Sequence, residues 1–187
     1  MKINLANYNQ SNYSRGKSGF YILLWWIMQG TLFRFSFHNM YGWRSLLLKL
    51  FGAKIGKSVK IRPSAKFTYP WKVSIGDHTW IGDNVKLYSL DHINIGSHCV
   101  VSQESYLCTG SHKIDDPNFS LITKPIVIKD GAWIASDVFV YPGITINNMA
   151  VVAARSTVTK DIPANEVHAG NPAKYVKKRF KDEEFYG

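Results

Sequence analysis

The chain has 187 residues, 45% of them apolar, and a formal net charge of +10 at neutral pH. This length and apolar content are typical of one domain with a continuous core, and no low-complexity run interrupts it. The excess of cations suggests a nucleic-acid partner, but the basic residues are spread along the chain and no groove-binding motif accompanies them, so we expect no nucleic-acid binding.

The first fifty residues contain two apolar segments. Residues 20–28 are followed by Gln29, Gly30 and Arg34, and the run is too short to span a bilayer, which needs about 20 apolar residues. It also lacks the basic start and small-residue cleavage site of a signal peptide. Residues 43–51 predict a second helix that ends before a glycine. Two roles stay open for these helices: covering an exposed apolar end of the following domain, or lying at a lipid boundary, where Trp, Phe and Leu alternate well with Arg and Lys.

Aliphatic residues then recur every six positions, often followed by a small residue. Neither a helix of period 3.6 nor a strand of period 2 has this pattern. The series comprises Ile75, Ile81, Leu87, Ile93, a restart at Ile95, Val101 and Leu107, and, after a gap, Ile128, Ile134, Val140, Ile146, Val152 and Val158.

A triangular prism explains this period. If six residues form one short strand and one corner, three such units close a coil whose inward aliphatic side chains stack on the next coil. The Ile-Gly pairs at 55–56, 75–76 and 95–96 are 20 residues apart, whereas Ile128 and Ile146 are 18 apart. Early coils therefore carry two extra corner residues. Since one unit cannot bury its apolar face alone, the coils must stack.

The repeat is interrupted between Leu107 and Ile128 by an excursion over residues 112–125 or so. A solenoid has no structural need for such an insertion, and insertions of this kind often form a binding face. Cys99 and Cys108 are the two cysteines. Nothing in their number or spacing indicates a disulfide framework, so we expect reduced side chains and a cytoplasmic protein.

Several motifs resemble those of the hexapeptide-repeat acetyltransferases, whose fold is a left-handed parallel β-helix. They are residues 55–59 (IGKSV), 108–112 (CTGSH), 142–146 (PGITI), 158–163 (VTKDIP) and 169–174 (AGNPAK). The likeness covers about residues 43–179 and is greatest to the maltose, galactoside and nodulation-type O-acetyltransferases and to the acetyltransferases of colanic acid and other exopolysaccharides. The left-handed sense follows from this resemblance and not from the period.

The resemblance implies that His112 is the general base, because the family histidine stands in a Gly-Ser-His context and only His112 matches it. Acetyl transfer from a thioester to a sugar hydroxyl needs a group that removes the hydroxyl proton and returns a proton to the thiolate. An imidazole with a pKa near 6.5 can perform both steps, without a covalent acyl-enzyme.

Other site residues follow from position or from the family. Asp91 and His92 occupy a corner one coil before His112, and we expect them to contact the acceptor. The resemblance implies that acetyl-coenzyme A is the donor and that its contacts come from Ser136, Ala154, Thr159, Lys160, Lys174 and Lys177. The last two positions carry lysine where the family often has arginine. Lysine keeps the positive charge but cannot bind a phosphate through two parallel N–H donors, as the planar guanidinium can. No metal is expected.

We therefore expect a mainly β chain in three parts. Residues 1–52 form an N-terminal helical cap, residues 53–165 the prism with its excursion, and residues 166–187 a basic C-terminal segment that is a short helix or a tail. The resemblance implies a homotrimer that acetylates a saccharide or lipid-linked saccharide in exopolysaccharide or cell-surface glycan synthesis. It would act in the cytoplasm, with peripheral contact to the inner face of the membrane.

Two other classes share this prism. The γ-type carbonic anhydrases hold a metal with three histidines from two subunits, but their closely spaced histidine pair is missing, since His92 and His112 are 20 residues apart. A non-catalytic scaffold would not explain why the Gly-Ser-His and Thr-Lys motifs occur together.

Overall fold

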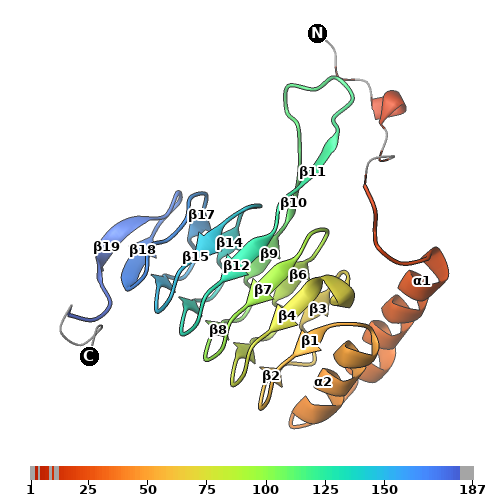
Figure 1. The fold of residues 1–187 in the computed structure, drawn as a ribbon, viewed down its shortest axis with the longest axis horizontal. Coiled ribbons are helices and arrows are strands. Elements are labelled where there is room, and N and C mark those ends of the chain that lie inside the picture. The colour runs from red at the N-terminus through yellow and green to blue at the C-terminus, as the bar shows by residue number, and fades with distance from the viewer. Residues whose placement is uncertain (1–2, 4, 9, 11–12, 182–187) are drawn as a thin grey trace.

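The protein is a parallel β-helix with two helices at one end and a hairpin arm on one side (Figure 1). The computed structural model describes residues 3, 5–8, 10 and 13–181. The remaining residues of the predicted cap and C-terminal segment, 1–2, 4, 9, 11–12 and 182–187, lie outside this description.

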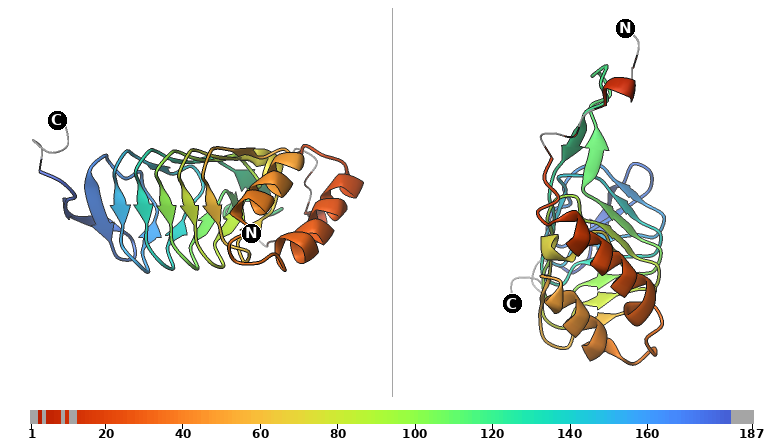
Figure 2. Two further views of the ribbon diagram at one scale, coloured as in Figure 1. Left: turned by 90° about the horizontal axis from the view of Figure 1, so that it is seen from below. Right: turned by 90° about the vertical axis from the view of Figure 1, so that its right-hand side faces the viewer.

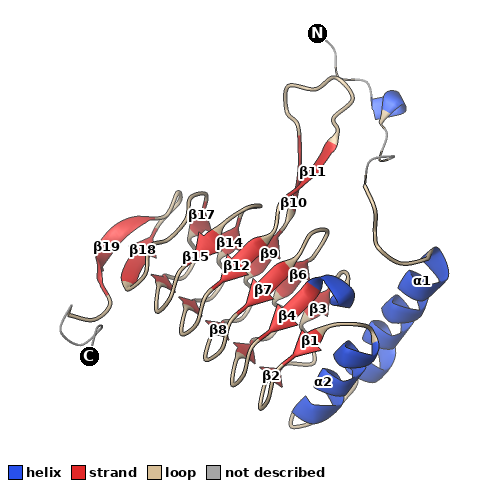
Figure 3. Ribbon diagram, viewed as in Figure 1, coloured by secondary structure: helices blue, strands red, loops and turns tan. Residues whose placement is uncertain are grey.

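The long helices lie at one end of the molecule and the strands follow one another along the prism, as Figure 3 shows. The helical elements are η1 (Leu5–Asn7), α1 (Gly19–Met28), η2 (Gln29–Phe33), α2 (Tyr41–Leu50) and η3 (Pro70–Lys72). The strands are β1 (Lys54–Ile55), β2 (Lys60–Ile61), β3 (Lys66–Phe67), β4 (Val73–Ile75), β5 (Trp80–Ile81), β6 (Lys86–Tyr88), β7 (Ile93–Ile95), β8 (Val100–Val101), β9 (Tyr106–Cys108), β10 (Gly110–His112), β11 (Leu121–Thr123), β12 (Ile126–Ile128), β13 (Trp133–Ile134), β14 (Phe139–Val140), β15 (Thr145–Ile146), β16 (Val151–Val152), β17 (Thr157–Val158), β18 (Glu166–Ala169) and β19 (Lys174–Lys178).

Three sheets form the faces of the prism. Sheet A has the order β1-β4-β7-β12-β15, sheet B the order β2-β5-β8-β13-β16-β18-β19, and sheet C the order β3-β6-β9-β14-β17. Ile55 pairs with Ile75 and Ile75 with Ile95, whereas Ile128 pairs with Ile146. The predicted coil lengths of 20 and 18 residues are confirmed.

The core is the ladder of inward aliphatic side chains that the period predicts. Each member of the predicted series is at most 3% exposed. Removing apolar surface from water contributes roughly 25 cal/mol per Å², so this ladder is the main source of stability for the prism. Both cysteines are buried and free, as expected.

The corners require unusual backbone geometry. His78 and His98 stand at equivalent corners of successive coils with φ of 58° and 56°, and their rings stack with centroids 5.0 Å apart. Close stacking of the coils also requires glycine at position 76. A Cβ there would lie 2.6 Å from the main-chain carbon of Gly96 and from the main-chain nitrogen of Ser97.

The helices α1 and α2 cover the open end of the first coil. The indole nitrogen of Trp25 donates to the main-chain oxygen of Phe67 at 2.8 Å, and the Gln29 side chain accepts from the main-chain nitrogen of Phe67 at 2.6 Å. The buried guanidinium of Arg44 donates to the main-chain oxygen of Ile61 at 2.6 Å. These side chains satisfy backbone groups that an uncapped edge would leave unpaired.

The C-terminal segment differs from the helix or tail that the sequence predicts. Strands β18 and β19 form an antiparallel hairpin that extends sheet B, with Ala169 opposite Lys174 and Val167 opposite Lys177. The edge of β16 offers unpaired backbone groups, which explains why a strand forms here: sheet pairing satisfies them and a tail does not.

Candidate active site

The excursion is an antiparallel hairpin that projects from the prism as an arm (Figure 1). Strands β10 and β11 pair Gly110 with Thr123 and His112 with Leu121. The arm leaves the prism after β9 of sheet C and returns before β12 of sheet A. It therefore starts at the edge between these two sheets, and the insertion inferred from the broken repeat is an ordered element.

His112 is partly exposed at the end of β10, in the strand pair of the arm that lies farthest from the prism, and it contacts Phe119. Its Nδ1 lies 2.7 Å from the main-chain oxygen of Phe119, and the two rings stack with centroids 4.2 Å apart and planes 8° apart. Because a carbonyl oxygen only accepts, Nδ1 carries the proton, and Nε2 of the neutral ring keeps its lone pair. In this tautomer Nε2 is the ring nitrogen that can accept a proton.

A turn within the arm positions Phe119. The Asp116 carboxylate accepts from the main-chain nitrogen of Asn118 at 2.9 Å and from the hydroxyl of Ser120. The main-chain nitrogen of Phe119 donates to the main-chain oxygen of Asp116 at 2.9 Å. The hydrogen bond from Ser120, with that from Asn118, lowers the pKa of Asp116. The carboxylate therefore stays ionised and closes the turn at neutral pH.

Two aromatic residues near His112 have no signal in the repeat pattern. Phe119 lies within the excursion, and the ring of Tyr8 approaches the His112 ring with centroids 5.9 Å apart. Figure 2 shows the N-terminal segment passing beside the arm before it reaches α1. Asp, Pro and Asn at residues 116–118 favour a turn, a sequence signal that could have indicated the hairpin.

Asp91 lies in the corner at the base of the arm. Its main-chain nitrogen donates to the Thr109 hydroxyl at 2.9 Å, and its carboxylate accepts from the main-chain nitrogen of His92 at 2.7 Å. Thr109 directly precedes β10, so this corner lies where the arm leaves the prism, and His112 stands three residues further along the arm. The contacts of Asp91 run to Thr109 and His92.

Two partly buried side chains, those of Tyr13 and Lys72, form hydrogen bonds beside the same corner. The Leu90 main-chain oxygen accepts from the hydroxyl of Tyr13 at 2.9 Å and from the ammonium group of Lys72. Burial raises the pKa of Tyr13, whereas burial lowers that of Lys72, an effect that the charge of Asp91 opposes. The sequence does not reveal these two residues as neighbours of the site.

The residues expected to bind the donor lie on two edges of the prism. Ser136 and Ala154 stand at stacked corners between sheets B and C, where the Ser136 main-chain oxygen accepts from the nitrogen of Arg155 at 2.9 Å. Thr159 and Lys160 follow β17 and stand at the edge between sheets C and A, from which the arm leaves. One prism therefore does not gather all four residues in one place.

Lys174 and Lys177 lie on β19, where both side chains are exposed. This strand is the last of sheet B, at the end of the prism opposite the helices (Figure 1). Within the described residues, no three His, Cys, Asp or Glu side chains lie close enough together to hold a metal ion.

Comparisons with known proteins show the family of this chain. No family model matches the chain. It is 53% identical over 169 residues to the "Putative colanic acid biosynthesis acetyltransferase WcaF" of Escherichia coli strain K12, an alignment covering 90% of this chain and 93% of that protein. The chain therefore belongs to the hexapeptide-repeat acetyltransferase family, and it is an acetyltransferase.

Solved structures show the same fold. A hexapeptide-repeat acetyltransferase from Vibrio cholerae, in complex with acetyl-coenzyme A, superposes with a TM-score of 0.80 at 26% identity, covering 90% of this chain and 92% of that one. A galactoside acetyltransferase in complex with coenzyme A gives 0.79 at 26% identity and covers 90% of both chains. The prism is thus a left-handed β-helix, as the resemblance implies.

Proposed function

We propose that this acetyltransferase moves an acetyl group from acetyl-coenzyme A to a saccharide hydroxyl in the synthesis of an exopolysaccharide or cell-surface glycan. The observation that carries the proposal is the bond between His112 Nδ1 and the Phe119 carbonyl. It leaves Nε2 as the proton acceptor. The donor and the glycan context follow from the family and from the relatives described above.

In the proposed reaction, Nε2 of His112 takes the hydroxyl proton while the oxygen attacks the thioester carbonyl carbon. A C–O bond forms, the C–S bond breaks, and the imidazolium returns its proton to the departing thiolate. No covalent acyl-enzyme is formed. Base catalysis of this kind contributes on the order of 100- to 10,000-fold, and holding both substrates in position contributes the remainder.

The donor is assigned to the residues that the family implies. The pantetheine chain of the donor would run along Ser136 and Ala154, where the small corner residues leave room for it. Thr159 and Lys160 would contact the donor near the β10–β11 hairpin. Lys174 and Lys177 would attract the phosphates of coenzyme A.

We propose a homotrimer whose active sites lie between subunits. The division of the donor residues between two edges supports this assembly, because His112 of one subunit can then face the Ser136 edge of its neighbour. Asp91 and His92 would contact the acceptor beside His112. The hydrogen bonds of Tyr13 and Lys72 to the main-chain oxygen of Leu90, which precedes Asp91, would hold this corner in place.

The acceptor is proposed to be a saccharide or lipid-linked saccharide at the inner face of the cytoplasmic membrane. Within the described residues, no helix has both the length and the apolar character needed to cross a bilayer. The N-terminal helices would instead contact the membrane from one side. This contact is separate from the chemistry of acetyl transfer.

Thiol release from acetyl-coenzyme A tests the reaction against a panel of free, nucleotide-linked and lipid-linked saccharides. The wild type is compared with His112→Ala and with His98→Asn, a corner substitution outside the site. Stimulation by one acceptor that His112→Ala abolishes and His98→Asn retains supports the proposal. Failure of the wild type to bind coenzyme A by calorimetry would overturn it and favour a scaffold.

A further inference from the structure

Basic residues occur along the whole chain, but an excess of them over acidic residues is found only in its first part. Residues 1–76 contain 12 lysines and arginines and no aspartate or glutamate, whereas residues 77–187 contain 11 lysines and arginines and 13 acidic residues. The net charge of +10 therefore arises entirely before Asp77. This region includes both helices and the first coil.

The same region exposes much of the apolar surface. Ten of the 20 large apolar side chains that are exposed among the described residues lie between positions 20 and 50. Three of them are phenylalanines, with 78% of Phe20, 82% of Phe35 and 79% of Phe37 accessible. Together we call these ten side chains the cap patch: Phe20, Leu23, Trp26, Ile27, Leu32, Phe35, Phe37, Met40, Leu46 and Leu50.

Helix α1 is apolar on both sides, although only one side packs. Ile22 and Trp25 are buried against the prism, while Phe20, Leu23 and Ile27 repeat at helical spacing on the opposite side. Figure 2 shows α1 as the outermost element at this end of the molecule. Capping the first coil thus explains the inward side chains and leaves the outward ones unexplained.

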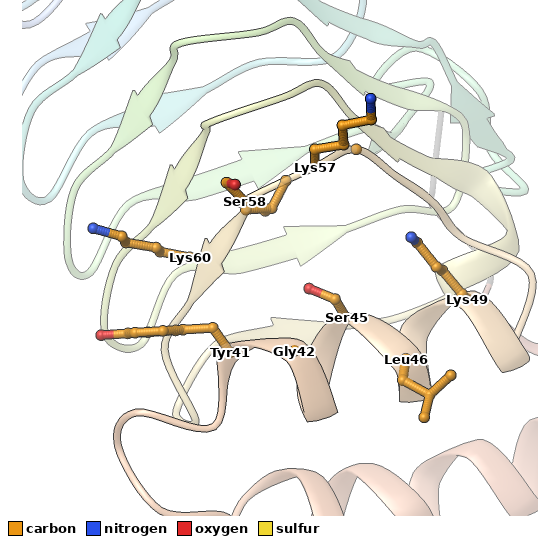
Figure 4. A pocket seen from close by; sticks show the side chains of 10 residues that line it. Tyr41, Gly42, Ser45, Leu46, Lys49, Lys57, Ser58 and Lys60 are labelled. Carbon is orange, nitrogen blue, oxygen red and sulfur yellow. The ribbon is translucent and has the colours of Figure 1, made fainter.

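A groove between α2 and the first coil is lined by basic and hydroxyl side chains. It encloses about 550 Å³ and is lined by the lysines at positions 49, 57 and 60, by the hydroxyls of Tyr41, Ser45 and Ser58, and by no acidic side chain. Lys49 rises from α2, and Lys57 and Lys60 extend from the coil above it (Figure 4). The three lysine side chains point in different directions (Figure 4), and the Lys60 ammonium lies 4.6 Å from the centre of the Trp80 ring. They therefore surround the groove with positive charge, which attracts the phosphates of lipid head groups.

We infer that the end of the prism formed by α1, η2 and α2 docks on a bilayer that contains anionic phospholipid. The cap patch enters the head-group boundary, and the groove at Lys49, Lys57 and Lys60 binds head-group phosphates. An amphipathic surface that combines Trp, Phe and Leu with Lys and Arg has the composition of interfacial membrane contacts. Anionic lipid also supplies the negative charge that this region lacks.

A second copy of the chain is the less favourable occupant. Docking two cap patches face to face would bring together two regions that contain cations and no acid, so their charges would repel. This inference rests on the membrane contact proposed above and not on the identity of the reaction.

Sedimentation with vesicles provides the first test. We expect the full chain to bind vesicles of phosphatidylcholine with phosphatidylglycerol, and to bind pure phosphatidylcholine far more weakly. Lys49→Gln with Lys57→Gln should weaken binding by about fivefold for each lysine. The matched control, Lys113→Gln with Lys129→Gln, removes the same charge outside the cap and should bind as the wild type does.

The apolar part of the surface has its own variants. Phe20→Ser, Phe35→Ser and Phe37→Ser together should abolish most vesicle binding, because they remove the three most exposed aromatic side chains of the cap patch. These side chains lie outside the core, so the variant should remain folded. Tyr175→Ser with Val176→Ser removes exposed apolar groups from β19 and should have no effect. Unchanged melting temperatures establish that each variant is folded.

Fluorescence quenching by lipids brominated on the acyl chain locates the contact. Trp26 and Trp133 are similarly exposed, 50% and 45%, so a difference in their quenching reports which of them contacts the bilayer. We expect Trp26→Phe to lose much of the quenching, with the remainder from the partly exposed Trp43 on α2, and Trp133→Phe to retain all of it. Equal binding to neutral and anionic vesicles, or quenching that is undiminished in Trp26→Phe, would overturn the inference.

Two further outcomes also decide against it. Self-association that the Phe20, Phe35 and Phe37 variant abolishes would assign the cap patch to a second copy, and binding to an acidic protein but not to vesicles would assign it to a protein partner. Thiol release with a water-soluble acceptor separates this inference from the proposed function. Vesicle binding without thiol release leaves the docking intact and overturns the acetyl transfer.

Discussion

His112 and Phe119 form a unit in which the histidine donates through Nδ1 to the phenylalanine main-chain oxygen at 2.7 Å, while the two rings stack. The phenylalanine has a φ of 51°, a conformation in which a bulky residue is uncommon. The Asp116 turn maintains that conformation. The orientation of the proposed base thus depends on a backbone geometry that the arm itself builds.

Replacing His112 by asparagine should remove catalysis and leave the arm in place. An asparagine can still donate to the Phe119 carbonyl, but it has no lone pair suited to accept a proton at neutral pH. We expect kcat to fall by about 100- to 10,000-fold with coenzyme A affinity unchanged. Steady-state kinetics and calorimetry measure the two quantities. A loss below about threefold would show that His112 is not the base.

Asp116→Asn should affect the same reaction through Phe119. The amide accepts less strongly than the carboxylate, so the turn loosens and His112 samples other orientations. We expect kcat to fall on the order of tenfold while the KM for acetyl-coenzyme A stays constant. Asp115→Asn removes a neighbouring charge and is the control. Equal effects of both substitutions would indicate a general charge effect and not positioning.

Two glycine substitutions should have opposite effects on stability. Gly76→Ala places a Cβ 2.6 Å from main-chain atoms of the next coil, which should cost about 1–3 kcal/mol of unfolding free energy. Gly42→Ala lies in α2 with no atom within 4 Å of the added Cβ, and it should gain up to about 1 kcal/mol. Urea unfolding monitored by circular dichroism compares the two. A neutral Gly76→Ala would contradict the close stacking of the coils.

Arg44 should be essential to the cap. Its guanidinium donates to the main-chain oxygens of Phe37 at 2.8 Å and His38 at 2.7 Å, in addition to that of Ile61. Burial lowers its pKa. Arg44→Met removes all three hydrogen bonds. The Phe37 oxygen still accepts from the main-chain nitrogen of Met40 at 3.0 Å, whereas the oxygen of the buried Ile61 loses its donor, at a cost of about 1–3 kcal/mol.

Arg44→Lys separates charge from geometry. Lysine keeps the positive charge but cannot reach three acceptors in different directions. We therefore expect both variants to melt at lower temperature than the wild type, with Arg44→Met the lower of the two. A lysine variant as stable as the wild type would show that charge alone is required.

The β18–β19 hairpin should weaken in acid because of Glu166. Its carboxylate accepts from His168 at 2.8 Å and from Lys178 at 3.3 Å, and the hydrogen bond from His168, with that from Lys178, lowers its pKa from the ordinary value of 4.5. A group with a lowered folded pKa stabilises the native state above its unfolded pKa. That contribution is lost as the pH falls below 4.5 towards the folded pKa.

Glu166→Gln should therefore be less stable than the wild type at neutral pH, and the difference should shrink on acidification to about pH 3. Melting temperatures across this range measure it, with Asp115→Asn as the charge control. A constant difference between wild type and Glu166→Gln at every pH would assign the effect to packing.

Much of the prism follows from the sequence because its determinants are local. An aliphatic residue at every sixth position, from Ile75 to Val158, decides which side chains face inward, and the spacing of Ile55, Ile75 and Ile95 decides the register of sheet A. The broken repeat likewise marks the arm, and the Gly-Ser-His motif singles out His112. Each of these conclusions needs only the repeat spacing or a short motif read directly from the sequence.

The remaining features needed the tertiary structure. The sequence does not show that Trp25 would meet Phe67 or that Arg44 would be buried at Ile61, and it predicts a helix or tail where β18 and β19 pair. Nor does it place Ser136 and Thr159 on different edges. These outcomes depend on what packs over an open end or an unpaired strand, which contacts between distant residues decide. A period of six residues specifies the coils, whereas their ends, edges and surfaces are set by the folded chain.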